Sequence, residues 1–118
     1  LVAKKNEINI LNVTIREVLK DDITALPYAK VDSFAFVILY AHPESEMRTM
    51  EKYSHEIISK VLDLGGSFYL PYKTHYSWDQ IKESYPEIIK WIKQKSKWDE
   101  NHLFTSKFFS LLTQYIKN

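Results

Sequence analysis

Three polar side chains, Asn12, Thr14 and Arg16, occupy alternate positions in the segment 8–19. The segment reads as a β-strand, because its apolar residues fall on the opposite parity and alternate residues of a strand point to the same face. An arginine beside an amide and a hydroxyl can bind an anionic or hydroxyl-bearing ligand. An ion pair between Arg16 and a nearby acid on an exposed face explains the arginine equally well. The pattern therefore indicates a binding face without establishing one.

A second group of candidates lies between Gly65 and Gln80, a stretch that holds both glycines of the chain and several ring side chains. Ring clusters of this kind are more often core, with hydroxyls reaching the surface, than ligand sites. Gly65 and Gly66 follow a helical pattern and are read as its stop, with Gly65 in the left-handed position. The candidate ligand-binding side chains of this stretch are Tyr69, Tyr72, Lys73, His75 and Tyr76.

The remaining titratable residues form no pattern typical of a metal or catalytic site. No two of the four histidines have the i, i+4 spacing of a helical metal site, and the chain has no cysteine. His55 lies in a charged stretch and is expected to be solvated. The acid pairs Asp21–Asp22 and Glu44–Glu46 lie at an expected turn and helix start, where carboxylates are favoured without any catalytic role. We therefore predict no metal site and assign no catalytic residue.

The composition of the 118-residue chain excludes several classes of protein. A net charge of +1 gives no electrostatic basis for binding nucleic acid or an anionic membrane surface. No apolar run approaches the roughly 20 residues of a membrane-spanning helix. The absence of cysteine excludes disulfides. We expect a cytoplasmic protein of one domain, with no nucleic-acid partner and no membrane span.

The candidate residues must be positioned by elements that the hydrophobic periodicity predicts. These are strands over 8–19, 34–41 and 67–70, and helices over 44–64, from 78, from Pro86 as a first helical residue, and over 106–116. Ser77 and Gln80 form a capping box that marks the helix start at 78. Because the strand 34–41 is apolar on both parities, we expect it to be central and covered on both faces. The apolar parity of 8–19 is expected to pack on helices.

This order of elements predicts a single α+β domain over residues 1–118, with an antiparallel sheet and helices packed mainly on one face. The helices are too few to cover both faces of such a sheet. The face that carries Asn12, Thr14 and Arg16 is then expected to stay open. On the residues alone, the function stays open as well.

Five segments, spread in order over nearly the whole chain, carry a resemblance to a known family. They read NVTIREV (12–18), DSFAFVILY (32–40), GGSFYLPY (65–72), YPEIIKW (85–91) and WDENHLFTS (98–106). In these segments the chain resembles the C-terminal part of the FAD-linked oxidases of the vanillyl-alcohol oxidase type, in particular bacterial relatives of alditol, sugar-lactone and decaprenylphosphoryl-ribose oxidases. Where the family typically has a proline and an asparagine in the last segment, this chain has Glu100 and Ser106.

The resemblance implies a ferredoxin-like α+β cap domain of an FAD-dependent oxidoreductase that acts on CH–OH donors. In that family a separate N-terminal domain binds FAD, and the open sheet face of the cap lies over the flavin and forms the substrate pocket. The chain would then be the C-terminal fragment of a larger enzyme, with its own N-terminal FAD-binding domain as partner, and would be inactive alone. The flavin would take hydride from a small hydroxylated, sugar- or alditol-like substrate.

Individual positions also match the family. Arg16 matches a strand position where relatives carry a substrate-contacting arginine or lysine, and Tyr69 matches a pocket-lining tyrosine. Tyr72 and His75 fall near positions where relatives place groups close to the flavin. The resemblance thus implies one set of substrate-binding residues and one set of cofactor-binding residues. The substrate set is Asn12, Arg16, Tyr69 and Lys73, and the cofactor set is Tyr72 and His75.

An alternative for the same fold is a free-standing ferredoxin-like module that binds a small ligand or a protein on its open sheet. This alternative needs no flavin. The reading frame upstream of Leu1 distinguishes the two hypotheses, because only the first requires several hundred coding residues with a flavin-binding pattern.

Overall fold

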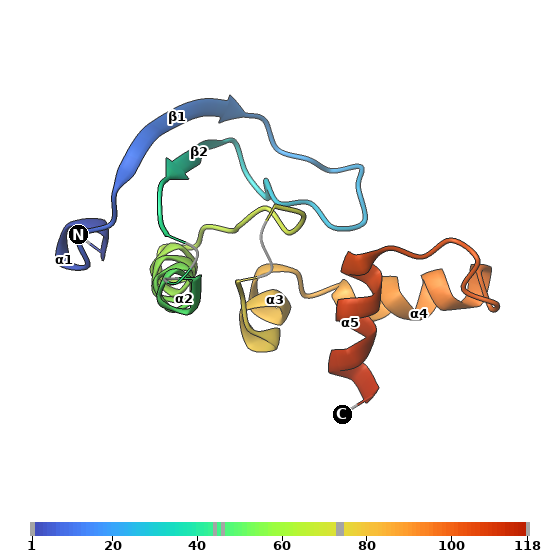
Figure 1. Cartoon of the computed structure of the whole chain (residues 1–118). Coiled ribbons are helices and arrows are strands. Elements are labelled where there is room, and N and C mark those ends of the chain that lie inside the picture. Colours follow the sequence, from blue (N-terminus) through green and yellow to red (C-terminus); the bar gives the residue numbers. More distant parts are fainter. Residues whose placement is uncertain (1, 44, 46, 73–74, 118) are drawn as a thin grey trace.

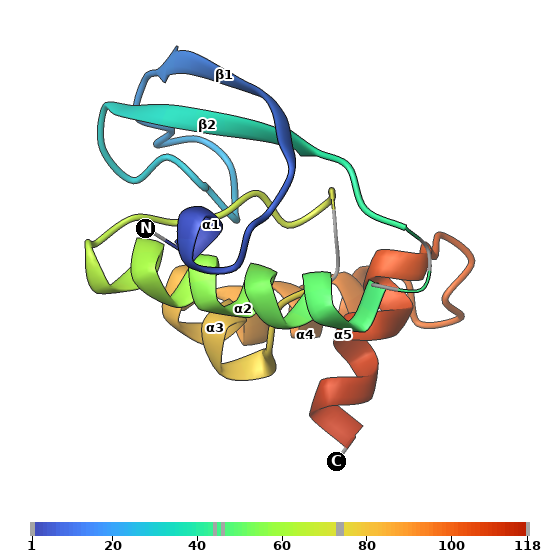
Figure 2. The ribbon, with the colours of Figure 1, turned by 60° about the vertical axis from the view of Figure 1, so that its left-hand side comes forward.

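The structure, a computed structural model, describes residues 2–43, 45, 47–72 and 75–117, with Lys117 described by its backbone alone. Its elements are α1 (Val2–Lys5), β1 (Ile10–Val18), β2 (Ser33–Tyr40), α2 (Met47–Asp63), α3 (Trp78–Ser84), α4 (Ile88–Trp98) and α5 (Lys107–Lys117). The helices and the antiparallel pair of β1 and β2 confirm the predicted α+β class. Figures 1 and 2 show this hairpin on one side of the molecule, with α2 to α5 on the other.

The register of the hairpin defines its two faces, because directly opposite residues of an antiparallel pair point to the same face. The face turned toward α2, here called the inner face, carries Ile10, Val13, Ile15, Phe36, Ile38 and Tyr40. The opposite face, here called the outer face, carries Asn12, Thr14, Arg16, Ala35, Val37 and Leu39. A register shift between Ile10 and Asn12 allows Ile10 to join the inner face.

The hydrophobic core lies in the second half of the chain, where α3, α4 and α5 pack together. Ile81, Ile88 and Leu112 are completely buried. The core consists of Leu70, Tyr76, Ile81, Tyr85, Ile88, Ile92, Phe109 and Leu112. From α5, Phe109 and Leu112 turn inward to this core. Neither strand of the hairpin contributes a side chain to this core.

Two sequence-based predictions about the sheet are wrong. β2 is neither central nor covered, since it belongs to a two-stranded sheet in the described part of the chain and its Phe34 and Phe36 are 68% and 61% exposed. The apolar parity of β1 is not packed on helices either, because Leu11 and Ile15 are both 59% exposed. The physical reason is that α3, α4 and α5 bury their apolar sides against one another, whereas an open groove lies between α2 and the hairpin.

The predicted strand at 67–70 does not form, because residues 67–69 have no regular secondary structure and Leu70 lies in a turn, so a ferredoxin-like sheet is not confirmed. Side-chain hydroxyls take the place of a neighbouring strand. The Tyr85 hydroxyl donates to the Phe68 carbonyl, and the Tyr76 hydroxyl donates to the Leu70 carbonyl at 3.2 Å. These bonds satisfy carbonyls that would otherwise need a strand on that side.

The side chains of Ser67 and Tyr69 connect this segment to the loop between β1 and β2. The Ser67 hydroxyl donates to the carbonyl of Tyr28 in that loop. The ring of Tyr28 meets the ring of Tyr69 edge-on, with centroids 5.4 Å apart. The segment 67–70 therefore ties the hairpin loop to the helical core.

The end of α2 is a Schellman motif, as the two glycines predicted. The N–H of Gly65 donates to the Leu62 carbonyl at 2.8 Å, and the N–H of Gly66 donates to the Val61 carbonyl at 2.9 Å. Gly65 has a φ of 74°, in the left-handed region that glycine adopts without strain.

The start of α3 also follows the local signal, because the capping box of Ser77 and Gln80 is present in both directions. The predicted start of the next helix is wrong by two residues. Its N-cap is Glu87 and its first residue is Ile88, so Pro86 lies outside it. Among the described residues, no helix combines the length and the apolarity needed to span a membrane.

Replacing Gly66 with alanine is expected to destabilise the protein more than replacing Gly65. A Cβ at position 66 would lie 2.7 Å from Cγ1 and 3.0 Å from the carbonyl oxygen of Val61, whereas a Cβ at position 65 meets nothing within 4 Å. We expect the free energy of unfolding, from urea titration, to fall by about 2–3 kcal/mol for Gly66→Ala and about 1 kcal/mol for Gly65→Ala. Equal losses would show that the end of α2 relaxes around the new methyl group.

Stability is expected to fall at alkaline pH because of the two core tyrosines. Burial raises the pKa of Tyr85 well above its ordinary value, and burial with a smaller effect of Tyr115 raises the pKa of Tyr76 to about 12. Above pH of about 10 the unfolded chain loses phenol protons that the folded chain keeps, so the free energy of unfolding decreases as pH rises.

The variant Tyr85→Phe tests this explanation. At neutral pH its free energy of unfolding should be about 1–2 kcal/mol lower than that of the wild-type chain, because the Phe68 carbonyl loses its donor. Above pH of about 10 the free energy of unfolding of the variant should decrease less steeply with pH than that of the wild-type chain. Urea titrations across this pH range measure both effects, and parallel pH profiles would contradict the assignment.

Candidate functional site

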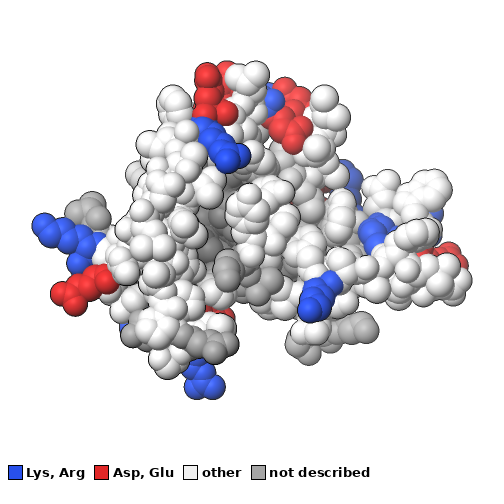
Figure 3. Space-filling model, turned by 45° about the horizontal axis from the view of Figure 1, so that its top comes forward, with Lys and Arg blue, Asp and Glu red and all other residues white. Residues whose placement is uncertain are grey.

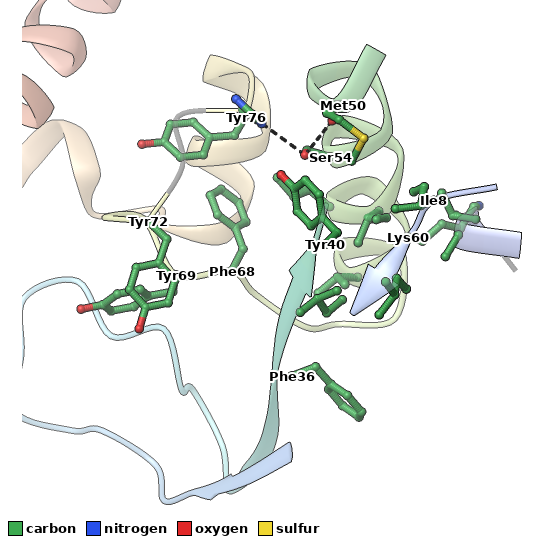
Figure 4. Close-up of a pocket in the computed structure, with 18 of the residues that line it drawn as sticks. Ile8, Phe36, Tyr40, Met50, Ser54, Lys60, Phe68, Tyr69, Tyr72 and Tyr76 are labelled. Carbon is green, nitrogen blue, oxygen red and sulfur yellow. Dashed lines mark hydrogen bonds between the residues drawn. The ribbon is translucent and has the colours of Figure 1, made fainter. Parts of the chain in front are cut away.

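An open groove of about 460 Å³ separates the inner face of the hairpin from α2. Its walls are almost wholly apolar, with Phe36 and Ile38 from β2 and with Ile57 and Val61 from α2. Figure 4 shows the groove between these elements, and Figure 3 shows that most of this face of the molecule is formed by uncharged side chains. Small-molecule sites commonly have volumes of about 300–1,000 Å³, so the groove has the size of a ligand site.

The groove becomes polar where α2 meets the segment before α3. The Ser54 hydroxyl donates to the Met50 carbonyl at 2.8 Å, and its oxygen lies 3.3 Å from Nδ1 of His75. Because the single serine proton is used on the carbonyl, Nδ1 of His75 is the donor in the second bond. The sequence analysis missed Ser54. Its position four residues after Met50 on the apolar side of α2 is the signal that places it beside the groove.

Two exposed tyrosines also line the groove. The rings of Tyr69 and Tyr72 meet edge-on, with centroids 4.9 Å apart, and Figure 4 shows them together. Tyr72 is 70% exposed. With His75, they give the lining of the groove ring faces and hydrogen-bonding groups.

His55 is bonded, contrary to the expectation that it is solvated. Its Nδ1 donates to Oε1 of Gln80 at 3.0 Å, and Nε2 of Gln80 donates to the His55 carbonyl at 2.9 Å and to Ser59 Oγ at 3.0 Å. This network fastens α2 to α3, so His55 has a structural role. Within the described ranges, no three histidine or acidic side chains gather as ligands of a metal ion.

The outer face of the hairpin carries a polar row on one strand and an apolar row on the other. Asn12, Thr14 and Arg16 on β1 are exposed side chains. Their opposite residues on β2 are Leu39, Val37 and Ala35. None of the three polar side chains forms a hydrogen bond or an ion pair with another residue that the structure describes. An intramolecular ion pair, one of the two explanations for Arg16, is therefore not seen in this part of the chain.

The structure divides the predicted site residues between two places. Tyr69, Tyr72 and His75 all line the groove. Asn12 and Arg16 share the outer face, on the other side of the hairpin. Lys73 lies outside the described residues. The six predicted residues therefore do not form one cluster in the described structure.

No protein-family model, no curated protein and no solved structure matches this chain. The chemistry of the two places is therefore the basis for assigning a function.

The variant Arg16→Gln is expected to fold as stably as the wild-type chain. Its guanidinium has no partner among the described side chains, so removing the charge should change the free energy of unfolding by less than about 0.5 kcal/mol. Urea titration in dilute solution at low and high salt measures this change. A salt-sensitive loss above about 1 kcal/mol would reveal an ion pair within the molecule and favour the structural explanation for Arg16.

Proposed function

We propose that the chain is the substrate-binding cap domain of an FAD-dependent oxidoreductase, and that it holds a hydroxylated, sugar- or alditol-like substrate on the outer face. The observation that carries the proposal is the polar row of β1 beside the apolar row of β2 on one exposed surface. A hydroxylated substrate needs donors and acceptors, and a flat flavin ring needs an apolar surface. The two rows offer both side by side, and the resemblance of the five sequence segments supports the same assignment.

The residues of the outer face fit the ring of FAD but not its dinucleotide. Ala35 and Val37 form an uncharged strip on a sheet surface, which suits a planar isoalloxazine. The sequence has no glycine-rich loop for the pyrophosphate. A separate FAD-binding domain would therefore hold the dinucleotide. When bound, the flavin supplies the hydride acceptor.

The role of this chain is then to bind and orient the substrate. The Arg16 guanidinium donates charge-assisted hydrogen bonds to substrate oxygens, and the Asn12 amide both donates and accepts. Tyr72 and His75, which the resemblance assigns to the cofactor, line the groove on the inner side. We therefore propose that Ala35 and Val37 contact the flavin ring in place of Tyr72 and His75.

Steady-state kinetics of Arg16→Ala in the full-length protein test the proposal. With alditols or sugar lactones as substrates, kcat/KM should fall roughly tenfold or more, since a lost hydrogen bond to a charged group costs about 1.5–3 kcal/mol. Flavin absorbance should be unchanged, because Arg16 orients substrate and does not hold the dinucleotide. Arg48→Ala, at an exposed position of α2, is the matched control and should leave the kinetics unchanged.

Two results would contradict the proposal. Unchanged kinetics of Arg16→Ala would remove the outer face from substrate binding. Stoichiometric retention of FAD by the 118-residue chain alone would show that the division between a cap and an FAD-binding domain is wrong.

A free-standing binding module is the second candidate, and the exposed apolar side chains on both strands of the hairpin favour it. Such a module would use the hairpin to contact a ligand or a protein without any flavin. The upstream reading frame decides between the candidates. A flavin-binding pattern there supports the oxidoreductase, and a start codon directly before Leu1 supports the module.

A further inference from the structure

The free edge of β1 is the least protected part of the hairpin. All nine residues from Ile10 to Val18 are exposed or half-buried, and in the described part of the chain β1 pairs with β2 alone. Figures 1 and 2 show β1 at the outer rim, with β2 nearer to the helices. A two-stranded hairpin is marginally stable by itself, and an unpaired edge rich in β-branched residues is a template for another strand.

The residues 12–16 of β1 are self-complementary about Thr14. If two copies of β1 pair antiparallel with Thr14 opposite its counterpart, Val13 lies opposite Ile15 and Asn12 lies opposite Arg16. This register places apolar side chains against apolar ones on the inner face, and polar side chains against polar ones on the outer face. It avoids the register shift at Ile10 and Asn12, because it needs the residues 12–16 only.

The charges also allow this register. Arg16 lies opposite an asparagine amide, whose oxygen can accept from the guanidinium. The two Arg16 side chains are four residues apart along the paired strands, about 14 Å, and at physiological ionic strength a separation of that size is largely screened. No like charges face each other between positions 12 and 16.

We propose that a second copy of this chain pairs with the β1 edge in this register and forms a four-stranded antiparallel sheet in the order β2, β1, β1, β2. The polar rows of the two copies then lie side by side at the two-fold axis, with an apolar row on each side. Each copy contributes Asn12, Thr14 and Arg16 to one shared surface, so one copy alone presents half of it. The use of that surface for substrate rests on the proposed function, whereas the strand pairing does not.

Cysteine crosslinking of Thr14→Cys tests the pairing directly. The chain has no cysteine, so any disulfide in this variant joins two molecules. Opposite Cβ atoms in an antiparallel pair lie about 4.5–5.5 Å apart, close to the spacing of a disulfide. Under mild oxidation we expect most of the variant to become covalent dimer. Gln114→Cys, at an exposed position of α5, is the matched control and should crosslink slowly.

The register has its own test. A mixture of Asn12→Cys and Arg16→Cys chains should form the mixed disulfide faster than either variant crosslinks with itself, because these positions face each other in the proposed pairing. Self-crosslinking of each variant at the same rate as the mixture would overturn the register.

Light scattering of the unmodified chain tests association without any crosslink. The wild-type protein should have twice the mass of the 14.0 kDa chain. Thr14→Lys should be a monomer with an unchanged circular dichroism spectrum, because two lysines would face each other at the axis. Gln114→Lys should stay a dimer.

A monomeric wild-type chain, or a Thr14→Lys variant that stays dimeric, would overturn the proposal. The first result would mean that β1 does not pair with a second copy of itself, and that any strand that pairs with this edge has a different sequence. Neither measurement uses turnover or flavin, so failure of the oxidoreductase assignment would leave this result unaffected.

Discussion

The fold depends on tyrosine hydroxyls that satisfy the carbonyls of one irregular segment, 67–70. A buried carbonyl without a donor costs about 1–3 kcal/mol, and in most α+β proteins a neighbouring strand supplies the donor. In this chain Tyr76 and Tyr85 donate to the segment 67–70 from the helical side. The segment can therefore lie against the helices without a strand partner, and through Ser67 it is bonded to the loop of the hairpin.

The sequence predicted the features that depend on neighbouring residues. The capping box of α3 is set by Ser77 and Gln80, three residues apart, and the end of α2 is set by Gly65 and Gly66. The alternation along β1 likewise predicted that Asn12, Thr14 and Arg16 share one exposed face. Each of these signals acts over a few residues, so no knowledge of the tertiary arrangement is needed to use it.

Features that depend on distant residues could not be predicted in the same way. The apolar residues of β2 indicate that another part of the protein should bury them, but they do not indicate which part. In the described chain, side chains such as Phe34, Phe36 and Leu39 stay exposed. The residues 67–70 have the composition of a strand, yet strand pairing needs a partner, and hydroxyls occupy that position instead. The placement of His75 and Arg16 on opposite sides of the hairpin follows from the position of α2 across the groove from the inner face, which no local pattern encodes.

The separation of the hairpin from the core has a consequence for how this surface can evolve. Substitutions in binding sites often lower stability, because the same side chains serve both the fold and the function. Here the strands contribute nothing to the main core, which is formed by residues from Leu70 to Leu112. Changes on the outer face therefore need no compensating changes among the core residues. The side chains of this surface can therefore change while the helical half of the chain stays the same.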